Sequence, residues 1–137
     1  MADANPTLAV QVVSPERVLY EGQAEMVVCR PADGEIAFLP GHVPFLGALG
    51  VAKVRALLPS GDEQVVAVHG GFVEVKDNHV IMLADIAQRP EEIDVAQAQA
   101  DESDASTRAS AGAGPGDVDK VAETDLKWAQ VRLEAVS

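Results

Sequence analysis

The sequence predicts a β plus α protein, in which an antiparallel β-sandwich or flattened barrel of about ten short strands precedes a two-helix antiparallel hairpin. Up to about residue 85, short apolar runs alternate with turn-forming residues, which is the spacing of strands. After Asp85 the chain becomes rich in Ala, Gln, Asp and Glu, and a glycine-rich break at 112–116 separates two helical segments. We therefore expect a sandwich domain at 1–87 and a hairpin domain at 88–137, with a linker near 109–116.

The composition agrees with a β-rich body. Hydrophobic residues make up 47% of the 137 residues, which is enough for a core, but aromatic residues make up only 4%. The core must therefore consist of Val, Ala, Leu and Ile, whose β-branched members favour strands. Cys29 is the only cysteine, so no disulfide can form within the chain, and we expect a small buried strand residue in a reducing compartment.

The strands are predicted from eight apolar runs and the turns between them. The turn signals are SPER at 14–17, PADG at 31–34, PSGD at 59–62 and KDNH at 76–79, and the last two are interpreted as hairpins. Eight or more short strands with no helical segment between them are typical of a sandwich. The runs are 8–13, 18–20, 26–29, 36–39, 51–58, 65–69, 72–75 and 80–83.

Two helices follow. Asp94 is the predicted N-cap of the first helix, with Gln97 completing an approximate capping box, and this helix ends near Arg108. Its apolar face is thin, since it offers little beyond Ile93 and alanines such as Ala96 and Ala100, so the hairpin is expected to be the less stable part of the protein. Asp117 or Asp119 caps the second helix. Its apolar stripe consists of Val118, Ala122, Leu126, Ala129, Leu133 and Val136.

The segment GEIAFLPGHVP at 34–44 is the most distinctive of the loops. Gly34 and Gly41 tolerate positive φ, and the prolines at 40 and 44 fix φ and donate no N–H group. Such residues give a loop a defined shape. We expect Glu35 and His42 to lie on its rim.

The residues do not form a recognisable catalytic constellation. The histidines His42, His69 and His79 lie 27 and 10 residues apart, so no HxH or HExxH spacing places two imidazoles on one face. Gly70-Gly71 lacks the lysine of a phosphate-binding loop and is predicted to mark a bulge or a close backbone approach. A small metal-dependent enzyme that uses the three histidines remains an alternative.

The charge and the N-terminus restrict the partners and the location. A net charge of −12 argues against a nucleic-acid partner, because phosphate binding depends on Lys and Arg and the chain has only ten. No segment approaches the roughly 20 apolar residues of a membrane helix, and no export signal or transit segment is recognisable. We expect a soluble protein of a bacterial cytoplasm, or of an organelle that encodes this chain.

The whole chain resembles the epsilon subunit of the rotary F-type ATP synthases, which is equivalent to the mitochondrial delta subunit. The resemblance rests on five fragments in the family's order, and it spans nearly the full length. Ala37 and Phe38 replace the family's usual Gly and Ile, and both are apolar. The fragments are Leu8–Val13 followed by SPE, YEGQA at 20–24, GEIAFLPGHVP at 34–44, HGGFVEV at 69–75 and LADIAQR at 83–89.

The resemblance implies a non-catalytic subunit of the central stalk, which links the gamma subunit to the ring of c subunits and couples rotation to ATP synthesis. Gly34 and Glu35 would meet the ring by their match to the family's motif, with His42 nearby at the gamma or ring junction. The implied location is the cytoplasmic face of the bacterial inner membrane, with no membrane span of its own.

The hairpin carries the regulatory role in this family, in which basic side chains grip the catalytic beta subunits and block ATP hydrolysis. Beyond residue 89 there are four basic residues, Arg108, Lys120, Lys127 and Arg132, against eleven acidic ones. Exposed ion pairs contribute only about 0 to 1 kcal/mol each, so we expect the contact with the alpha and beta subunits, and the inhibition, to be weak.

Some members of the family bind ATP on the folded hairpin through an Ile/Leu-Asp-x-x-Arg-Ala motif. Ile93 and Asp94 match this motif, but Gln97 stands at the position of the arginine. Losing one charge-assisted phosphate contact removes about 1.5 to 3 kcal/mol, so we expect no ATP cofactor. The alternative from a different class is a free-standing sandwich adaptor whose acidic hairpin binds a basic protein.

Overall fold

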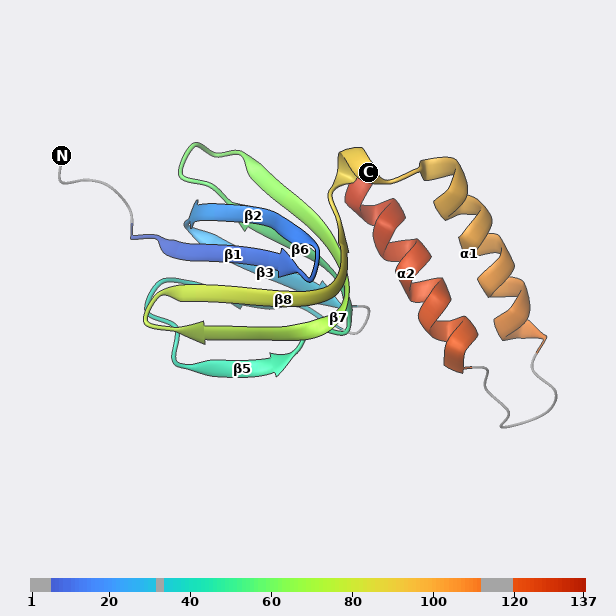
Figure 1. The fold of residues 1–137 in the computed structure, drawn as a ribbon, viewed down its shortest axis with the longest axis horizontal. Helices are drawn as coiled ribbons and strands as arrows, with labels where there is room; N and C mark the ends of the chain where they lie inside the picture. Colours follow the sequence, from blue (N-terminus) through green and yellow to red (C-terminus); the bar gives the residue numbers. More distant parts are fainter. Residues whose placement is uncertain (1–5, 32–33, 112–119) are drawn as a thin grey trace.

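The structure is a computed structural model, and it describes residues 6–31, 34–111 and 120–137. Eight strands form a β-sandwich that is followed by two antiparallel helices (Figure 1). The strands pair in the order β2-β1-β8-β7-β6-β3-β4, with β5 beside β7, so the sheet is open rather than a closed barrel. The strands are β1 (Leu8–Ser14), β2 (Arg17–Ala24), β3 (Met26–Pro31), β4 (Ile36–Phe38), β5 (Phe45–Ala48), β6 (Val51–Leu57), β7 (Glu63–Lys76) and β8 (His79–Gln88).

The predicted fold class, a sandwich followed by a helical hairpin, is confirmed. Its details differ in two respects. The described residues form eight strands rather than about ten, and β1 pairs with β8 in parallel, whereas the other pairs are antiparallel. A parallel pair joins the first and last strands of the domain, so no local turn signal announces it.

Strand β7 explains part of the difference in strand number. The runs 65–69 and 72–75 were predicted as two strands, but Gly70 and Gly71 continue the chain with φ of +79° and +107°. The first part of β7 pairs with β6, and the part after the glycines pairs with β5. The two glycines thus allow one strand to pair with β6 in its first part and with β5 in its second part. Glycine is suited to this position because it tolerates positive φ and a close neighbouring backbone.

The core lies between the layers of the sandwich. Alternate residues of β1, namely Leu8, Val10 and Val12, are buried, as the period of two in a strand requires. Cys29 is buried in β3, and burial raises the pKa of its thiol to about 11. The prediction of a small buried strand residue is therefore confirmed.

A 3₁₀ turn, η1 (Pro90–Glu92), connects the sandwich to α1 (Val95–Ser110), and α2 (Lys120–Val136) completes the hairpin. Asp94 is the N-cap of α1, and its Oδ1 accepts the backbone N–H of Gln97 at 3.0 Å, so the predicted start is confirmed. The Gln97 side chain does not close a capping box but donates to Asp101. The predicted caps at 117 and 119 and the predicted Val118 lie outside the described residues.

Helix α2 lies between the sandwich and α1 (Figure 1). A second apolar cluster, separate from the sandwich core, joins the hairpin to β6 and β7. The predicted stripe of α2 is buried at Ala122 and Ala129 and half-buried at its three larger residues, 126, 133 and 136.

The prediction for α1 was wrong about which alanines are buried. The alanines at 96 and 100 are exposed, while Ala98 and Ala105, two turns apart, are fully buried. Within the described ranges, no helix is long and apolar enough to cross a membrane.

Candidate functional site

The predicted contact residues Gly34, Glu35 and His42 do not form one cluster. Gly34 and Glu35 are exposed and precede β4, whereas His42 follows the other end of that strand. Glu35 makes no ion pair or hydrogen bond with any other residue that the structure describes. Its carboxylate is therefore available to a partner, but the single rim expected from the sequence is divided by β4.

His42 packs into the fold. Its ring is half-buried, with its centroid 5.2 Å from that of Phe38 and 6.3 Å from that of Phe45, both in edge-on geometry. Its Nδ1 lies 2.7 Å from the carbonyl oxygen of Val43. The imidazole thus fixes the shape of the turn, as an aromatic ring in contact with two others does.

The turn that contains His42 is hydrogen-bonded to the turn between β7 and β8. The backbone N–H of Gly41 donates to Oδ1 of Asn78 at 2.7 Å, and Gly41 has a φ of +87°. β8 begins beside this contact and leads at its other end into η1 and the hairpin. The turn therefore lies at the end of the sandwich that is distant from the helices (Figure 1).

An exposed apolar surface covers the outer face of β5, β7 and β8. Its exposed fractions are 70% at Leu46, 60% at Phe72 and 54% at Leu83, and together with Ile81 these residues line a pocket that also includes Glu74. Phe72 is paired with Leu83 across the β7–β8 ladder. We refer to Leu46, Phe72, Ile81 and Leu83 as the outer patch.

The outer patch was not predicted from the sequence. The signal was present, because β8 carries apolar residues at both alternating sets of positions, with Val80 and Met82 buried and Ile81 and Leu83 facing outward. Strands that are apolar on both faces are typical of sheets in which both faces are buried against other structure. In an isolated chain the second face has no cover, which makes it a candidate contact surface.

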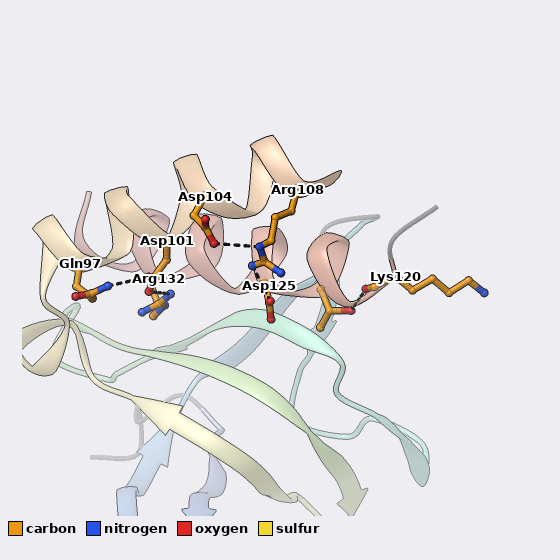
Figure 2. Close-up of polar contacts among 8 residues, drawn as sticks. Gln97, Asp101, Asp104, Arg108, Lys120, Asp125 and Arg132 are labelled. Carbon is orange, nitrogen blue, oxygen red and sulfur yellow. Dashed lines mark hydrogen bonds and ion pairs between the residues drawn. The ribbon is translucent and has the colours of Figure 1, made fainter. Parts of the chain in front are cut away.

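The arginines of the hairpin are engaged within the hairpin itself (Figure 2). Arg108 pairs with Asp104 and Asp125, each at 3.0 Å, and these hydrogen bonds raise the pKa of its guanidinium. Lys120 and Lys127, by contrast, are exposed, and the Lys120 ammonium points away from the cluster (Figure 2).

Arg132 is the most enclosed of these cations. Its side chain is 12% exposed, pairs with Asp101 at 3.0 Å and lies 5.2 Å over the ring of Trp128. Hydrogen bonds from Gln97 and Arg132 lower the pKa of the Asp101 carboxyl. The arginines therefore hold α1 and α2 together.

The residues that match the nucleotide motif serve the start of α1. Ile93 is buried in the second cluster, Asp94 caps the helix, and the amide of Gln97 donates to Asp101 at 2.8 Å. All three side chains thus have structural partners in this state.

Glu92 forms a clasp that sequence reasoning did not identify. Its carboxylate accepts two hydrogen bonds from the Arg17 guanidinium, one of them at 2.7 Å, and a third from the backbone N–H of Arg89 at 2.8 Å. The bond from Arg17 is the main reason that the pKa of Glu92 falls to about 2. Arg17 and Glu92 are 75 residues apart, so no local pattern could pair them.

The three histidines lie in different parts of the fold. His42 packs against two phenylalanines, the ring of His69 contacts Trp128 edge-on at 5.4 Å, and Nδ1 of His79 lies 2.8 Å from the carbonyl oxygen of Asp77. Among the described residues no group of three or more side chains could hold a metal ion.

The comparisons with known proteins agree on one family. The β-sandwich domain of the ATP synthase delta/epsilon chain matches residues 7–90. The chain is 45% identical over 96 residues to the ATP synthase epsilon chain of Desulforudis audaxviator, covering 70% of this chain and 69% of that one. It is 48% identical over 94 residues to the epsilon chain of Brevibacillus brevis, covering 68% and 70% of the two chains.

Solved structures show the same fold at lower identity. A chain of the Euglena gracilis mitochondrial ATP synthase superposes with a TM-score of 0.78 at 20% identity, over 100% of this chain and 87% of that one. A chain from the central stalk and c-ring of the Tetrahymena thermophila enzyme has a TM-score of 0.65 at 12% identity, over 97% and 98% of the two chains. With its sandwich, its two helices and these relatives, the chain belongs to the family of ATP synthase delta/epsilon chains.

Proposed function

We propose that this protein is a non-catalytic rotor subunit in the central stalk of a proton-translocating F-type ATP synthase, where it links the gamma subunit to the c-ring and couples rotation to ATP synthesis. The family relationship supports the stalk role. The outer patch is the observation that supports the contact with the gamma subunit. Two rotor subunits that turn together need a permanent interface, and a rigid apolar surface is suited to one.

The outer patch is suited to the gamma subunit. Leu46, Phe72 and Leu83 come from three hydrogen-bonded strands, so the patch is rigid before any partner binds. Binding to a preformed apolar surface loses little conformational entropy, which favours a permanent contact. Aromatic residues are frequent energetic anchors in interfaces, and Phe72 is 60% exposed at the middle strand of the patch.

Contact with the c-ring is assigned to the segment on either side of β4. Gly34 and Glu35 precede the strand, and the turn with His42 follows it. The exposed Glu35 carboxylate can pair with basic side chains or accept N–H groups from polar loops. His42 supports this contact by holding the turn, rather than by offering a free imidazole.

The hairpin is proposed to reach the alpha and beta subunits weakly and to inhibit ATP hydrolysis little. Arg108 and Arg132 already pair with Asp side chains, which leaves Lys120 and Lys127 for an acidic partner. No ATP cofactor is proposed, because Gln97 carries no charge and is bonded to Asp101. The assembled protein would lie peripherally on the cytoplasmic face of the bacterial inner membrane.

The decisive test is Phe72→Asp in the full chain. A carboxylate at the centre of the patch would be desolvated in the complex, so affinity for the gamma subunit should fall at least about tenfold. Co-purification of the two subunits after co-expression measures it. Because Phe72 faces outward, the variant should retain the circular dichroism spectrum and the unfolding midpoint of the original protein.

The matched control is Val121→Asp, which places the same group at another exposed apolar residue, 68% accessible and in the first turn of α2. It should leave binding unchanged. Normal gamma binding by a folded Phe72→Asp protein would reject the outer patch as the contact. Failure of even the unaltered chain to bind gamma would favour the free-standing adaptor.

A further inference from the structure

We propose that Glu74 gives the outer patch its specificity, by forming an ion pair with an arginine or lysine side chain that the gamma subunit places against the patch. This inference rests on the proposed function, and it adds the chemistry that the partner must present. It follows from the position of one carboxylate on an otherwise apolar face.

Glu74 lies at the centre of the outer patch. It is paired with Leu46 of β5 on one side and with Ile81 of β8 on the other, and these three strands lie side by side (Figure 1). Residues that are directly paired on neighbouring strands share one face of the sheet, so Glu74 faces outward with them. Phe72 and Leu83 form the next outward-facing pair along the same two strands. Glu74 therefore has apolar neighbours on three sides.

The Glu74 carboxylate has no partner in the free chain. Among the residues that the structure describes, none forms an ion pair or a side-chain hydrogen bond with it. Lys76 lies two residues further along the same face of β7 but is not paired with it. Because Glu74 is exposed, water solvates its charge as long as the patch is uncovered.

A partner that covers the patch removes this water. Burying an unpaired carboxylate is unfavourable, and charged residues are depleted at the centre of interfaces for that reason. A cation opposite Glu74 offsets the loss, and the planar guanidinium of arginine can donate two parallel hydrogen bonds to a carboxylate. The pocket that Glu74 lines together with the outer patch has a volume of about 360 Å³, which leaves room for the end of a long basic side chain.

Glu21 is a second acid on the same face, in a different setting. It lies on β2 at the edge of the sheet, and its carboxylate accepts a hydrogen bond from Nε2 of Gln11 at 2.9 Å. Gln11 is paired with Glu21 on one side and with Ile81 on the other, so the two acids lie in one row across the sheet. An exposed charge at the edge of an interface contributes little to affinity, whereas a desolvated pair at its centre contributes to specificity.

The test is Glu74→Gln in the full chain, measured as binding kinetics to a complex of the alpha, beta and gamma subunits that lacks this chain. Affinity should fall about thirtyfold or more, mainly through faster dissociation, because the partner's cation is left buried and unpaired. Glu74→Leu should bind as weakly, although it extends the apolar surface. Since Glu74 faces outward, both variants should retain the circular dichroism spectrum and the unfolding midpoint of the original protein.

Glu21→Gln is the matched control, because it removes the same charge from the same face. It should change affinity less than about twofold. Equal losses in Glu21→Gln and Glu74→Gln would indicate attraction between net charges rather than a local ion pair, and would overturn the proposal. Unchanged or tighter binding by Glu74→Leu would overturn it as well, since Glu74 would then only keep the free face soluble.

Phe72→Asp distinguishes this inference from the proposed contact itself. Weakened binding by Phe72→Asp, together with normal binding by both Glu74 variants, would reject the ion pair and leave the outer patch as the gamma contact. Normal binding by a folded Phe72→Asp protein would reject the contact and the ion pair together.

Discussion

Gly71 illustrates how a single residue can determine the path of a strand. A Cβ atom at this position would lie 1.9 Å from the carbonyl oxygen of Leu83 in the neighbouring strand, and φ is +107°. The pairing of Phe72 with Leu83 depends on this close approach of two backbones. The residue therefore supports the outer patch as well as the core.

We predict that Gly71→Ala lowers the free energy of unfolding by about 3 kcal/mol, the sum of left-handed strain and steric overlap in a packed sheet. Urea denaturation followed by circular dichroism measures the change. Gly34→Ala serves as the control, because the added methyl group would meet no atom within 4 Å and should be nearly neutral. Equal stability of the two variants would contradict this account of β7.

The two glutamates at 35 and 92 show what residue-level reasoning can and cannot identify. Glu35 was singled out from the turn residues around it, and the structure leaves it exposed. Glu92 carried no signal, since its partner Arg17 is distant in sequence and the contact exists only after β2 and η1 have been brought together. Turn-forming residues can predict a loop, but they cannot predict an ion pair between distant segments.

At the scale of elements, η1 joins two units whose apolar clusters are separate. The clasp of Glu92 with Arg17 is the ionic contact that fixes this connection to the first hairpin of the sandwich. Because the folded-state pKa of Glu92, about 2, lies below the ordinary value of 4.5, the charged form is the one that stabilises the fold.

We predict that Glu92→Gln lowers stability at neutral pH, and that this deficit disappears in acid. The contribution of the clasp should be complete above pH 4.5 and should be lost as the pH falls through about 2, where Glu92 itself is protonated. Denaturation curves of both proteins at several pH values give the difference. Glu91→Gln removes a neighbouring exposed charge and should show no comparable trend, whereas a deficit that persists at pH 2 would refute the assignment.

At the scale of the whole molecule, the charge distribution disfavours nucleotide binding. The chain carries a net charge of −12, and residues 90–137 contain eleven acidic against four basic residues. Two of those four bases, Arg108 and Arg132, are neutralised by Asp partners. An anionic ligand would therefore approach a surface of like charge with few free cations.

We predict that calorimetric titration of the full chain with ATP gives no binding in the micromolar range. Gln97→Arg is the informative variant, because it restores the one charge that the family's motif has and this chain lacks. A charge-assisted contact with phosphate should raise affinity about ten- to a hundredfold, unless Asp101 captures the new guanidinium. Micromolar binding by the unaltered protein would refute the prediction.

The sequence by itself determined the features that depend on neighbours along the chain. Apolar alternation specified strands, Asp94 specified the start of α1, and five fragments in order indicated the family. These signals are local, since turn chemistry, capping and side-chain periodicity act over a few residues.

Tertiary structure decided everything that joins distant segments. The parallel pairing of β1 with β8, the continuous path of β7, the outer patch and the burial of Ala98 in place of Ala96 follow from packing. A strand or helix can be recognised from its own residues, but its orientation depends on the surfaces it must bury. For the same reason the sequence did not reveal that Arg108 pairs with Asp125 and Arg132 with Asp101, two ion pairs that join the helices of the hairpin.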